Sequence, residues 1–266
     1  MSTLATTFRD LHQNKTPLRL ANAWDAGSAR LIESVGAPAI ATTSAGVAWA
    51  LGYPDGDTLP IRDLAAVVAA ITRIVHIPLS VDFEGGYADD PARVGENIAP
   101  LLDAGAVGIN IEDGSGTPDR LAAKIEHIRR VAAGKGVDLF INARVDVYLK
   151  GLAPPADRVT EVIARARRYR DAGADGIFVP ALVDPAQIRQ VVGATPLPVN
   201  LLAWKDLPPA AALAALGVRR LSAGSGICQS LWGRAVGLAR AFLADGASGP
   251  LAEGAMTHPQ INALFL

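Results

Sequence analysis

The sequence predicts an α/β fold, a (β/α)8 TIM barrel in a single domain, and three observations lead to it. A sequence pattern that consists of a helix end, a glycine and a short β-rich run recurs at residues 33–44, 102–113, 170–181 and 214–225. Four further β-rich runs interleave with it, at residues 18–23, 77–83, 139–145 and 197–203. Amphipathic stretches of helical length separate these runs. Eight βα units with mostly apolar strands are typical of a closed parallel sheet covered by helices.

A doubly wound open sheet is the alternative architecture. It normally has fewer strands and a glycine-rich nucleotide-binding turn after the first strand, where this chain has NAWDAGS (22–28). The barrel is therefore favoured. We expect a lead-in helix within residues 1–17, the barrel over 18–245, and an irregular tail with a short apolar end over 246–266.

Composition excludes several classes of protein. The formal net charge of −1 gives no reason to expect a nucleic-acid partner. Cys228 is the only cysteine, which excludes an intrachain disulfide and a cysteine-built zinc site. The longest apolar stretches, such as 64–71, are too short to span a membrane, and the N-terminus has no signal pattern. We expect a cytoplasmic protein with no membrane partner.

Polar residues gather where the predicted strands end, at the mouth where barrels place their function. Asp82 and Glu84 are two apart in an extended chain, so they point to the same side, and Glu112 follows the neighbouring strand. Buried like charges need a cation, and oxygen ligands without His or Cys favour Mg²⁺, with Mn²⁺ as the alternative. The sequence therefore predicts a metal site at Asp82, Glu84 and Glu112, coordinating directly or through water. The alternative is that these acids cap helices or pair with Arg144.

Other candidate groups at the mouth point to different chemistry. The planar guanidinium of Arg144 suits a substrate carboxylate. Lys150 and Lys205 follow two strands and would suit a Schiff-base aldolase, although surface loops commonly carry lysine. The glycines of SAGSGI (222–227) suit either a phosphate or a plain turn. No histidine follows a predicted strand, so a histidine base is not expected.

Four blocks, TTSAGVAWALGYPD (42–55), VDFEGGYAD (81–89), GINIED (108–113) and INARVD (141–146), carry a family resemblance. In order and spacing they resemble motifs of the isocitrate lyase / phosphoenolpyruvate mutase superfamily, over about residues 19 to 240. The resemblance implies that Thr43, Ser44 and Ala45 hold a substrate carboxylate and enolate oxygen. It implies an acidic residue near the reacting carbon at Asp55, and the Mg²⁺ shell at Asp82, Glu84 and Glu112.

The same resemblance assigns substrate binding to Arg144 and Asn200, with Asn200 on the far carboxylate. It also implies a homotetramer, a dimer of dimers, in which the last barrel helix (230–244) swaps between paired subunits.

The chain departs from this family pattern in two places. Lyases carry a loop with the catalytic cysteine after the fourth strand, and mutases carry a gating loop there, whereas this chain has only GSGTPDR (114–120). Pro180 stands where lyases have a glutamate. These departures argue against isocitrate or methylisocitrate cleavage and against chemistry on a phosphorus–carbon bond.

The retained residues suit a small 2-oxo or 2-hydroxy mono- or dicarboxylic acid, whose reaction passes through an enolate. We expect a metal-dependent lyase, with decarboxylation of an oxaloacetate-like acid favoured because CO₂ leaves without a general acid. Retro-aldol cleavage is the second reaction, and its base would be Asp55 or a tyrosine such as Tyr53 or Tyr87. A binding protein for 2-oxo dicarboxylates such as 2-oxoglutarate, without turnover, stays open as the alternative.

Overall fold

The computed structural model describes residues 3–266, and within them the strands form one parallel sheet in the order β1-β9-β8-β7-β6-β5-β4-β3-β2. The strands are β1 (Leu18–Leu20), β2 (Asn22–Ala23), β3 (Ile40–Thr42), β4 (Leu79–Asp82), β5 (Gly108–Glu112), β6 (Phe140–Arg144), β7 (Gly176–Val179), β8 (Val199–Leu202) and β9 (Arg220–Ser222). β1 pairs with β9 and β2 pairs with β3, so the two halves of the first predicted strand close the sheet. The fold is therefore a parallel α/β barrel of the TIM type, as predicted.

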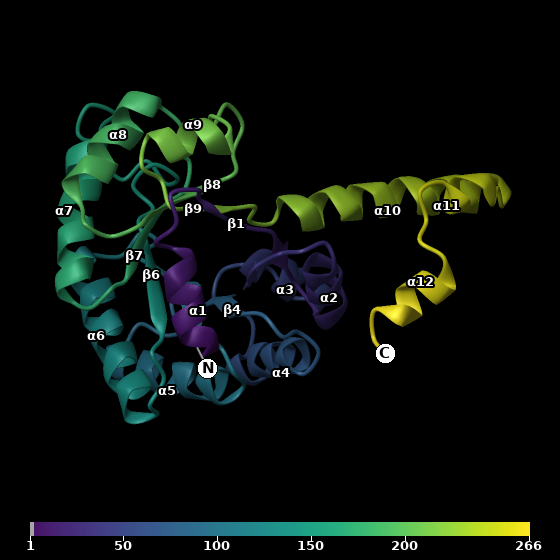
Figure 1. The fold of residues 1–266 in the computed structure, drawn as a ribbon, viewed down its shortest axis with the longest axis horizontal. Helices are drawn as coiled ribbons and strands as arrows, with labels where there is room; N and C mark the ends of the chain where they lie inside the picture. Colours follow the sequence, from purple (N-terminus) through teal and green to yellow (C-terminus); the bar gives the residue numbers. More distant parts are fainter. Residues whose placement is uncertain (1–2) are drawn as a thin grey trace.

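The helices alternate with these strands and cover the outside of the barrel (Figure 1). They are α1 (Leu4–Leu11), α2 (Ala26–Ser34), α3 (Ser44–Ala50), α4 (Ile61–Thr72), α5 (Pro91–Asp103), α6 (Pro118–Gly134), α7 (Arg158–Asp171), α8 (Pro185–Ala194), α9 (Ala210–Ala215), α10 (Gly226–Asp245), α11 (Gly249–Ala252) and α12 (His258–Ala263). Three of them begin with the same signal, a capping Asp or Thr followed by proline, at Asp90, Thr117 and Asp184. Each cap side chain accepts a backbone N–H, and proline sits where its missing N–H costs nothing.

The barrel wall has two chemically different faces. Side chains such as Val81, Ile109 and Ile141 are fully buried in the layer between strands and helices. Alternate residues point inward and are polar: Asn142 donates to Asn110 Oδ1 at 2.9 Å, and Arg220 donates to the same oxygen at 3.2 Å. Because β5 and β9 lie far apart in the strand order, the Arg220 contact crosses the barrel interior.

Helix α1 closes the end of the barrel where the strands begin. Phe8 packs with Leu18, Leu20 and Phe140, and its ring lies 2.6 Å from where a Cβ on Gly108 would stand. Only glycine leaves room for this ring at the start of β5. The lead-in helix expected within residues 1–17 thus forms part of the core.

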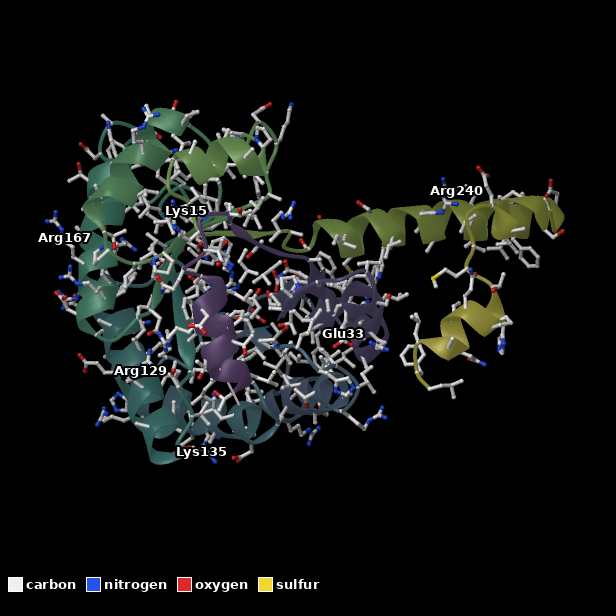
Figure 2. All side chains as sticks on the ribbon, viewed as in Figure 1. Lys15, Glu33, Arg129, Lys135, Arg167 and Arg240 are labelled. Carbon is white, nitrogen blue, oxygen red and sulfur yellow. The ribbon has the colours of Figure 1, made fainter. Side chains whose placement is uncertain are left out.

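The end of the chain differs from the expectation. The tail after Gly246 was expected to be irregular, but it contains the short helices α11 and α12. Thr257 and Gln260 form a reciprocal capping box and Pro259 stands in the first turn, which explains why α12 forms. Helix α10 projects from the barrel rather than packing on its side, α11 lies at its far end, and α12 turns back below it towards the barrel (Figure 1). Figure 2 shows Arg240 on this projecting helix, away from the barrel.

A second difference from the sequence prediction is helix α3, which the pattern of the sequence did not indicate. It begins at Ser44 directly after β3 and ends at Ala50. Within residues 3–266, no helix has the length and apolar character needed to cross a membrane.

His12 at the barrel base should make stability pH-dependent. Its Nδ1 bonds Phe8 O at 2.7 Å and its ring stacks on Phe140, 2 % exposed. Burial, reinforced by the nearby charge of Arg220, lowers the pKa of His12 to about 3. The unfolded chain takes up a proton near pH 6.5 and the folded chain does not, so the free energy of unfolding falls as pH drops from 6.5 towards 3. At pH 5 this loss is about 2 kcal/mol.

Urea denaturation of wild type and His12→Asn between pH 7 and 4.5 measures this effect. His12→Asn should have a lower free energy of unfolding than wild type at pH 7. That free energy should also change less as the pH falls. Exposed His76 provides the matched control, since His76→Asn should leave the slope unchanged. Equal slopes in wild type and His12→Asn would contradict the assignment.

Candidate active site

A cavity of about 130 Å³ opens at the end of the barrel where the strands finish. One arc of its wall is polar and comes from β2 through β6 and the loops after them: Asn22, Thr43, Ser44, Asp55, Asp82, Asn110 and Arg144. The opposite arc is apolar and comes from the ends of β7 and β8 and the loop after β6: Leu149, Phe178, Pro180, Leu202 and Trp204. The volume is below the range typical of pockets for drug-sized ligands, so the ligand is small.

Arg144 is the cation that lies among the carboxylates at the mouth. Its Nε and Nη2 donate to the two carboxylate oxygens of Asp146 at 2.7 and 3.2 Å. Its Nη1 lies 2.5 Å from Glu112 Oε2. The side chain of Asp146 is completely buried, so this pair is shielded from water. Arg144 therefore has both a structural partner and a face on the cavity.

Glu84 is held by the loop between α3 and α4. Its carboxylate accepts the Gly56 N–H at 2.9 Å and the Asp57 N–H, and Tyr87 donates its hydroxyl to it at 2.8 Å. Glu84 adopts a left-handed backbone conformation, φ 48°, which is costly for a residue with a side chain. These contacts compensate that cost and turn the chain sharply after β4.

A second cavity of about 350 Å³ lies beside the first and contains the outer carboxylates. Glu84, Glu112 and Asp57 line it, together with Lys124 and Lys150. The Arg144–Glu112 ion pair separates the two cavities, because Arg144 lines the inner one and Glu112 the outer one.

A buried cluster under the outer cavity fixes the loop after β5. Asp113 accepts hydrogen bonds from Arg165 Nη1 at 2.8 Å, the Tyr169 hydroxyl at 2.7 Å and the Asp146 N–H at 2.9 Å. All three donors saturate one carboxylate, and they tie α7 to the ends of β5 and β6. Asp113 thereby holds Asp146, and Asp146 holds Arg144.

The acids at the mouth share a direction of pKa shift. Burial, the largest cause, raises the pKa of Asp82, Glu84, Asp57 and Asp146, and raises that of Glu112 to about 8. Arg144 opposes the shift at Asp82, Asp146 and Glu112, while neighbouring carboxylates add to it at Asp82, Glu84 and Glu112. The site therefore holds more buried carboxyl groups than cations, and a bound cation would favour their charged forms.

Donor chemistry and charge at this mouth both fit a hard divalent ion. Asp82 faces the inner cavity and accepts the Ser44 N–H at 3.2 Å, while Glu84 and Glu112 stand behind it. Among residues 3–266, no three acidic, His or Cys side chains already converge on one point as metal ligands. Each predicted ligand is instead engaged with a protein donor.

The predicted substrate residues divide into two groups. Thr43, Ser44, Ala45 and Asp55 line the inner cavity with Asp82 and Arg144.

Two predicted residues lie elsewhere. Tyr53 packs against the hydrophobic core and does not line the cavity. Asn200 is buried one layer below it, bonded through Nδ2 to Ser222 Oγ at 3.1 Å. Asn200 therefore does not reach a far carboxylate in this conformation.

The loop that follows β5 is as short as the sequence indicated. β5 ends at Glu112, a tight turn contains Gly114 with φ 54°, and α6 begins at Pro118. This connection extends no segment over the cavity.

The matching family model, described as phosphoenolpyruvate phosphomutase, covers residues 8–243. The chain belongs to this family. A solved structure of a Burkholderia cenocepacia protein, described as a candidate phosphonomutase, is 41 % identical with a TM-score of 0.85, covering 90 % of this chain and 100 % of that one.

Two curated relatives with named reactions are about equally similar to the chain. An oxaloacetate decarboxylase of Pseudomonas fluorescens is 30 % identical over 85 % of this chain and 80 % of its own. A 2-methylisocitrate lyase of Escherichia coli is 29 % identical over 72 % of this chain and 67 % of its own. Members of the superfamily are thus enzymes acting on small carboxylic acids.

Sequence reasoning missed the inner residues that shape the cavity floor. Arg220 is 1 % exposed, and its Nε donates to Ser222 Oγ at 3.3 Å. Its Nη1 has no hydrogen-bond partner, and burial lowers its pKa to about 9. Its alternation with Ser222 in the strand could have placed it inside the barrel. The pattern could not show that it lacks a carboxylate partner.

Removing the Arg144 guanidinium should destabilise the fold as well as alter the site. Arg144→Gln leaves the carboxylate of Asp146 buried without its partner, which costs about 3 kcal/mol in the free energy of unfolding. Asp146→Asn in the same chain should restore part of the loss. Lys150→Met, 3.9 Å from Asp146 at the surface, is the control and should change stability little. Urea denaturation measures all four proteins, and an unchanged Arg144→Gln would exclude the structural role.

Proposed function

We propose that this chain is a Mg²⁺-dependent lyase that acts on a small 2-oxo or 2-hydroxy acid through an enolate, with oxaloacetate-type decarboxylation as the favoured reaction. The observation that supports it is that Asp82 and Arg144 line the same arc of the inner cavity, where burial raises the pKa of Asp82. Mn²⁺ would serve the same donors.

Arg144 and α3 would hold the acid head of the substrate. The Arg144 guanidinium faces the cavity and suits a carboxylate. Thr43, Ser44 and Ala45 line the same cavity and would receive the 2-oxo oxygen and the remaining carboxylate oxygen. Asp82, Glu84 and Glu112 would hold Mg²⁺, directly or through water, and the ion would supply positive charge where the enolate oxygen develops.

Decarboxylation needs little else from the protein. The bond from C3 to the departing carboxylate breaks, CO₂ leaves, and the electron pair becomes the C2–C3 enolate. The enolate then takes up one proton at C3, from Asp55 or from water. No cysteine or histidine lines the inner cavity, which favours this reaction over one that needs a strong acid.

Retro-aldol cleavage is the second candidate, supported by the similarity to a 2-methylisocitrate lyase. It requires a base for the substrate hydroxyl, and Asp55 is the group in the cavity that suits this role. Tyr53 lies outside the cavity, and the Tyr87 hydroxyl is engaged with Glu84. A protein that binds 2-oxo dicarboxylates without turnover is the remaining alternative.

We also propose a homotetramer, a dimer of dimers, in which α10 packs on a paired subunit. The helix leaves the barrel and exposes Leu231, Trp232, Val236, Phe242 and Leu243. Val35, the C-cap residue of α2, is 83 % exposed, which is high for a large apolar side chain. Light scattering should give four times the chain mass of 27.6 kDa, and a stable monomer would contradict the proposal.

Turnover of oxaloacetate tests the proposed reaction. Purified protein with Mg²⁺ should release pyruvate faster than Mg²⁺ alone, and excess EDTA should abolish the difference. Asp82→Asn should lower the rate at least about 100-fold, because it removes the one proposed metal ligand that lines the inner cavity. Asp103→Asn, an exposed acid on α5, is the matched control and should act like wild type. Ligand-induced thermal shifts without product would favour the binding protein, and EDTA-resistant activity trapped by borohydride at Lys150 or Lys205 would favour the Schiff-base aldolase.

A further inference from the structure

The floor of the inner cavity consists of polar side chains that rest on a buried guanidinium. Asn110 and Ser222 line the cavity, and Arg220 lies beneath them at the start of β9. Arg220 donates through Nη2 to Asn110 Oδ1 at 3.2 Å and through Nε to Ser222 Oγ at 3.3 Å. Its guanidinium carbon lies 5.9 Å from the centre of the Phe8 ring. Arg220 therefore occupies the layer between helix α1 and the cavity.

This guanidinium has no anionic partner of its own. Arg220 is 1 % exposed, and among residues 3–266 no hydrogen bond joins it to a carboxylate. The acid whose charge bears on it is Asp82, in the wall of the cavity above. An unpaired buried charge destabilises a fold, so stability alone does not account for an arginine at this position. Its charge is left to act on whatever occupies the cavity.

The contact with Arg220 determines which way the Asn110 amide faces. Asn110 Oδ1 accepts from Arg220 Nη2 and, at 2.9 Å, from Asn142 Nδ2. The amide nitrogen cannot take this place, because it cannot accept a hydrogen bond. Asn110 Nδ2 is therefore turned to the cavity, where no residue of the described chain, 3–266, accepts from it. In the strand register Asn110 stands beside Asp82, so this donor lies next to the groups proposed to hold the acid.

We propose that Arg220 is a positioning residue for anion binding, which turns the Asn110 amide so that its Nδ2 donates to an oxygen of the bound acid. This assignment rests on the proposed function, which names the acid. Arg220 itself does not touch the ligand. Its charge polarises the amide through the bond to Oδ1 and so strengthens the hydrogen bond that Nδ2 donates.

Stability separates this role from a purely structural one. Arg220→Met removes the charge and keeps an unbranched side chain in its place. Each oxygen that Arg220 contacts keeps a second donor, Asn142 at Asn110 and Asn200 at Ser222, so the variant leaves neither oxygen without a partner. The urea midpoint of Arg220→Met should therefore equal or exceed that of wild type. A clearly lower midpoint would make Arg220 a structural residue and overturn the assignment.

Calorimetry with oxalate, with and without Mg²⁺, measures the affinity for an anion. Oxalate should bind Arg220→Met about 10-fold more weakly than wild type, the effect of losing one charge-strengthened hydrogen bond. Arg220→Lys retains a charged donor and should recover part of the loss. Arg219→Met is the matched control, because Arg219 is partly exposed and donates to Val218 O at 3.3 Å. Equal oxalate affinity in wild type and Arg220→Met would overturn the proposal.

A double variant tests whether Arg220 acts through Asn110. Asn110→Ala removes the donor itself, and in that background Arg220→Met should weaken oxalate binding little further. Additive losses would show that Arg220 acts by another route and would contradict the positioning role. If Asn110→Ala does not fold, the comparison of Arg220→Met with Arg220→Lys decides, since equal oxalate affinity in these two variants would also contradict it.

The same measurements distinguish this assignment from the proposed reaction. Oxalate binding that depends on Arg220 and Asn110, without turnover of oxaloacetate, would support the assignment while the reaction fails. Metal-dependent turnover with an oxalate affinity that Arg220→Met leaves unchanged would support the reaction and overturn the assignment. Wild-type protein that binds no oxalate would overturn the assignment as well.

Discussion

The mouth of the barrel depends on one guanidinium held among buried carboxylates. Arg144 makes a two-point contact with Asp146, which has no exposed surface, and reaches Glu112 with its remaining nitrogen. A buried carboxylate without a partner is costly, so the positions of these side chains are coupled rather than independent. Asp113 extends the coupling, since Arg165 and Tyr169 hold it while it accepts the N–H of Asp146. The cluster thus orients Arg144 towards the cavity before any ligand arrives.

The acidic side chains of this cluster outnumber the basic ones. This imbalance is the feature of the structure that bears on its chemistry. Arg144 faces Asp82, Glu112 and Asp146, while Glu84 and Asp57 form a second acidic group beside it. Lys124 donates to Gly85 O at 2.7 Å, and burial lowers its pKa, so it compensates the acids only in part. The buried Arg220 lies deeper in the barrel and bonds Asn110 and Ser222, which line the cavity floor. This arrangement is the basis of the proposal that a small anion binds together with a divalent cation.

Much of this arrangement could be predicted from the sequence. The glycine-terminated helix ends and the interleaved β-rich runs predict the barrel, because both periodicities are local properties of the chain. The alternation of Arg144 with Asp146 predicts a shared side, and these two side chains bond each other. The shared side expected for Asp82 and Glu84 is wrong, because the left-handed backbone at Glu84 turns its side chain to the outer cavity while Asp82 lines the inner one. Of the three predicted metal ligands, Glu112 pairs with Arg144, which is the alternative that the sequence left open. The short loop after Glu112 follows directly from the count of residues before Pro118.

The depth of a side chain within the barrel and the paths of the loops could not be predicted from the sequence. Alternation places Asn200 inside the barrel, but it cannot show that the cavity ends one layer above, at Leu202. Tyr53 follows α3, a helix that the motif gave no reason to expect, and the path of that loop turns its ring to the core. In the sequence, Phe178 and Trp204 cannot be told from ordinary strand and loop residues. Closure of the sheet places them across the cavity from Asp82. The direction of α10 depends on what packs against its apolar face, which one chain does not specify.

Titration calorimetry of Mg²⁺ into the purified protein, with and without oxalate as an inert stand-in for the acid head, tests this account most directly. The buried carboxyl groups of Asp82, Glu84 and Glu112 predict one Mg²⁺ per chain, bound more tightly when oxalate is present and lost in Asp82→Asn. Absence of Mg²⁺ binding under both conditions, or equal binding by wild type and Asp82→Asn, would contradict it.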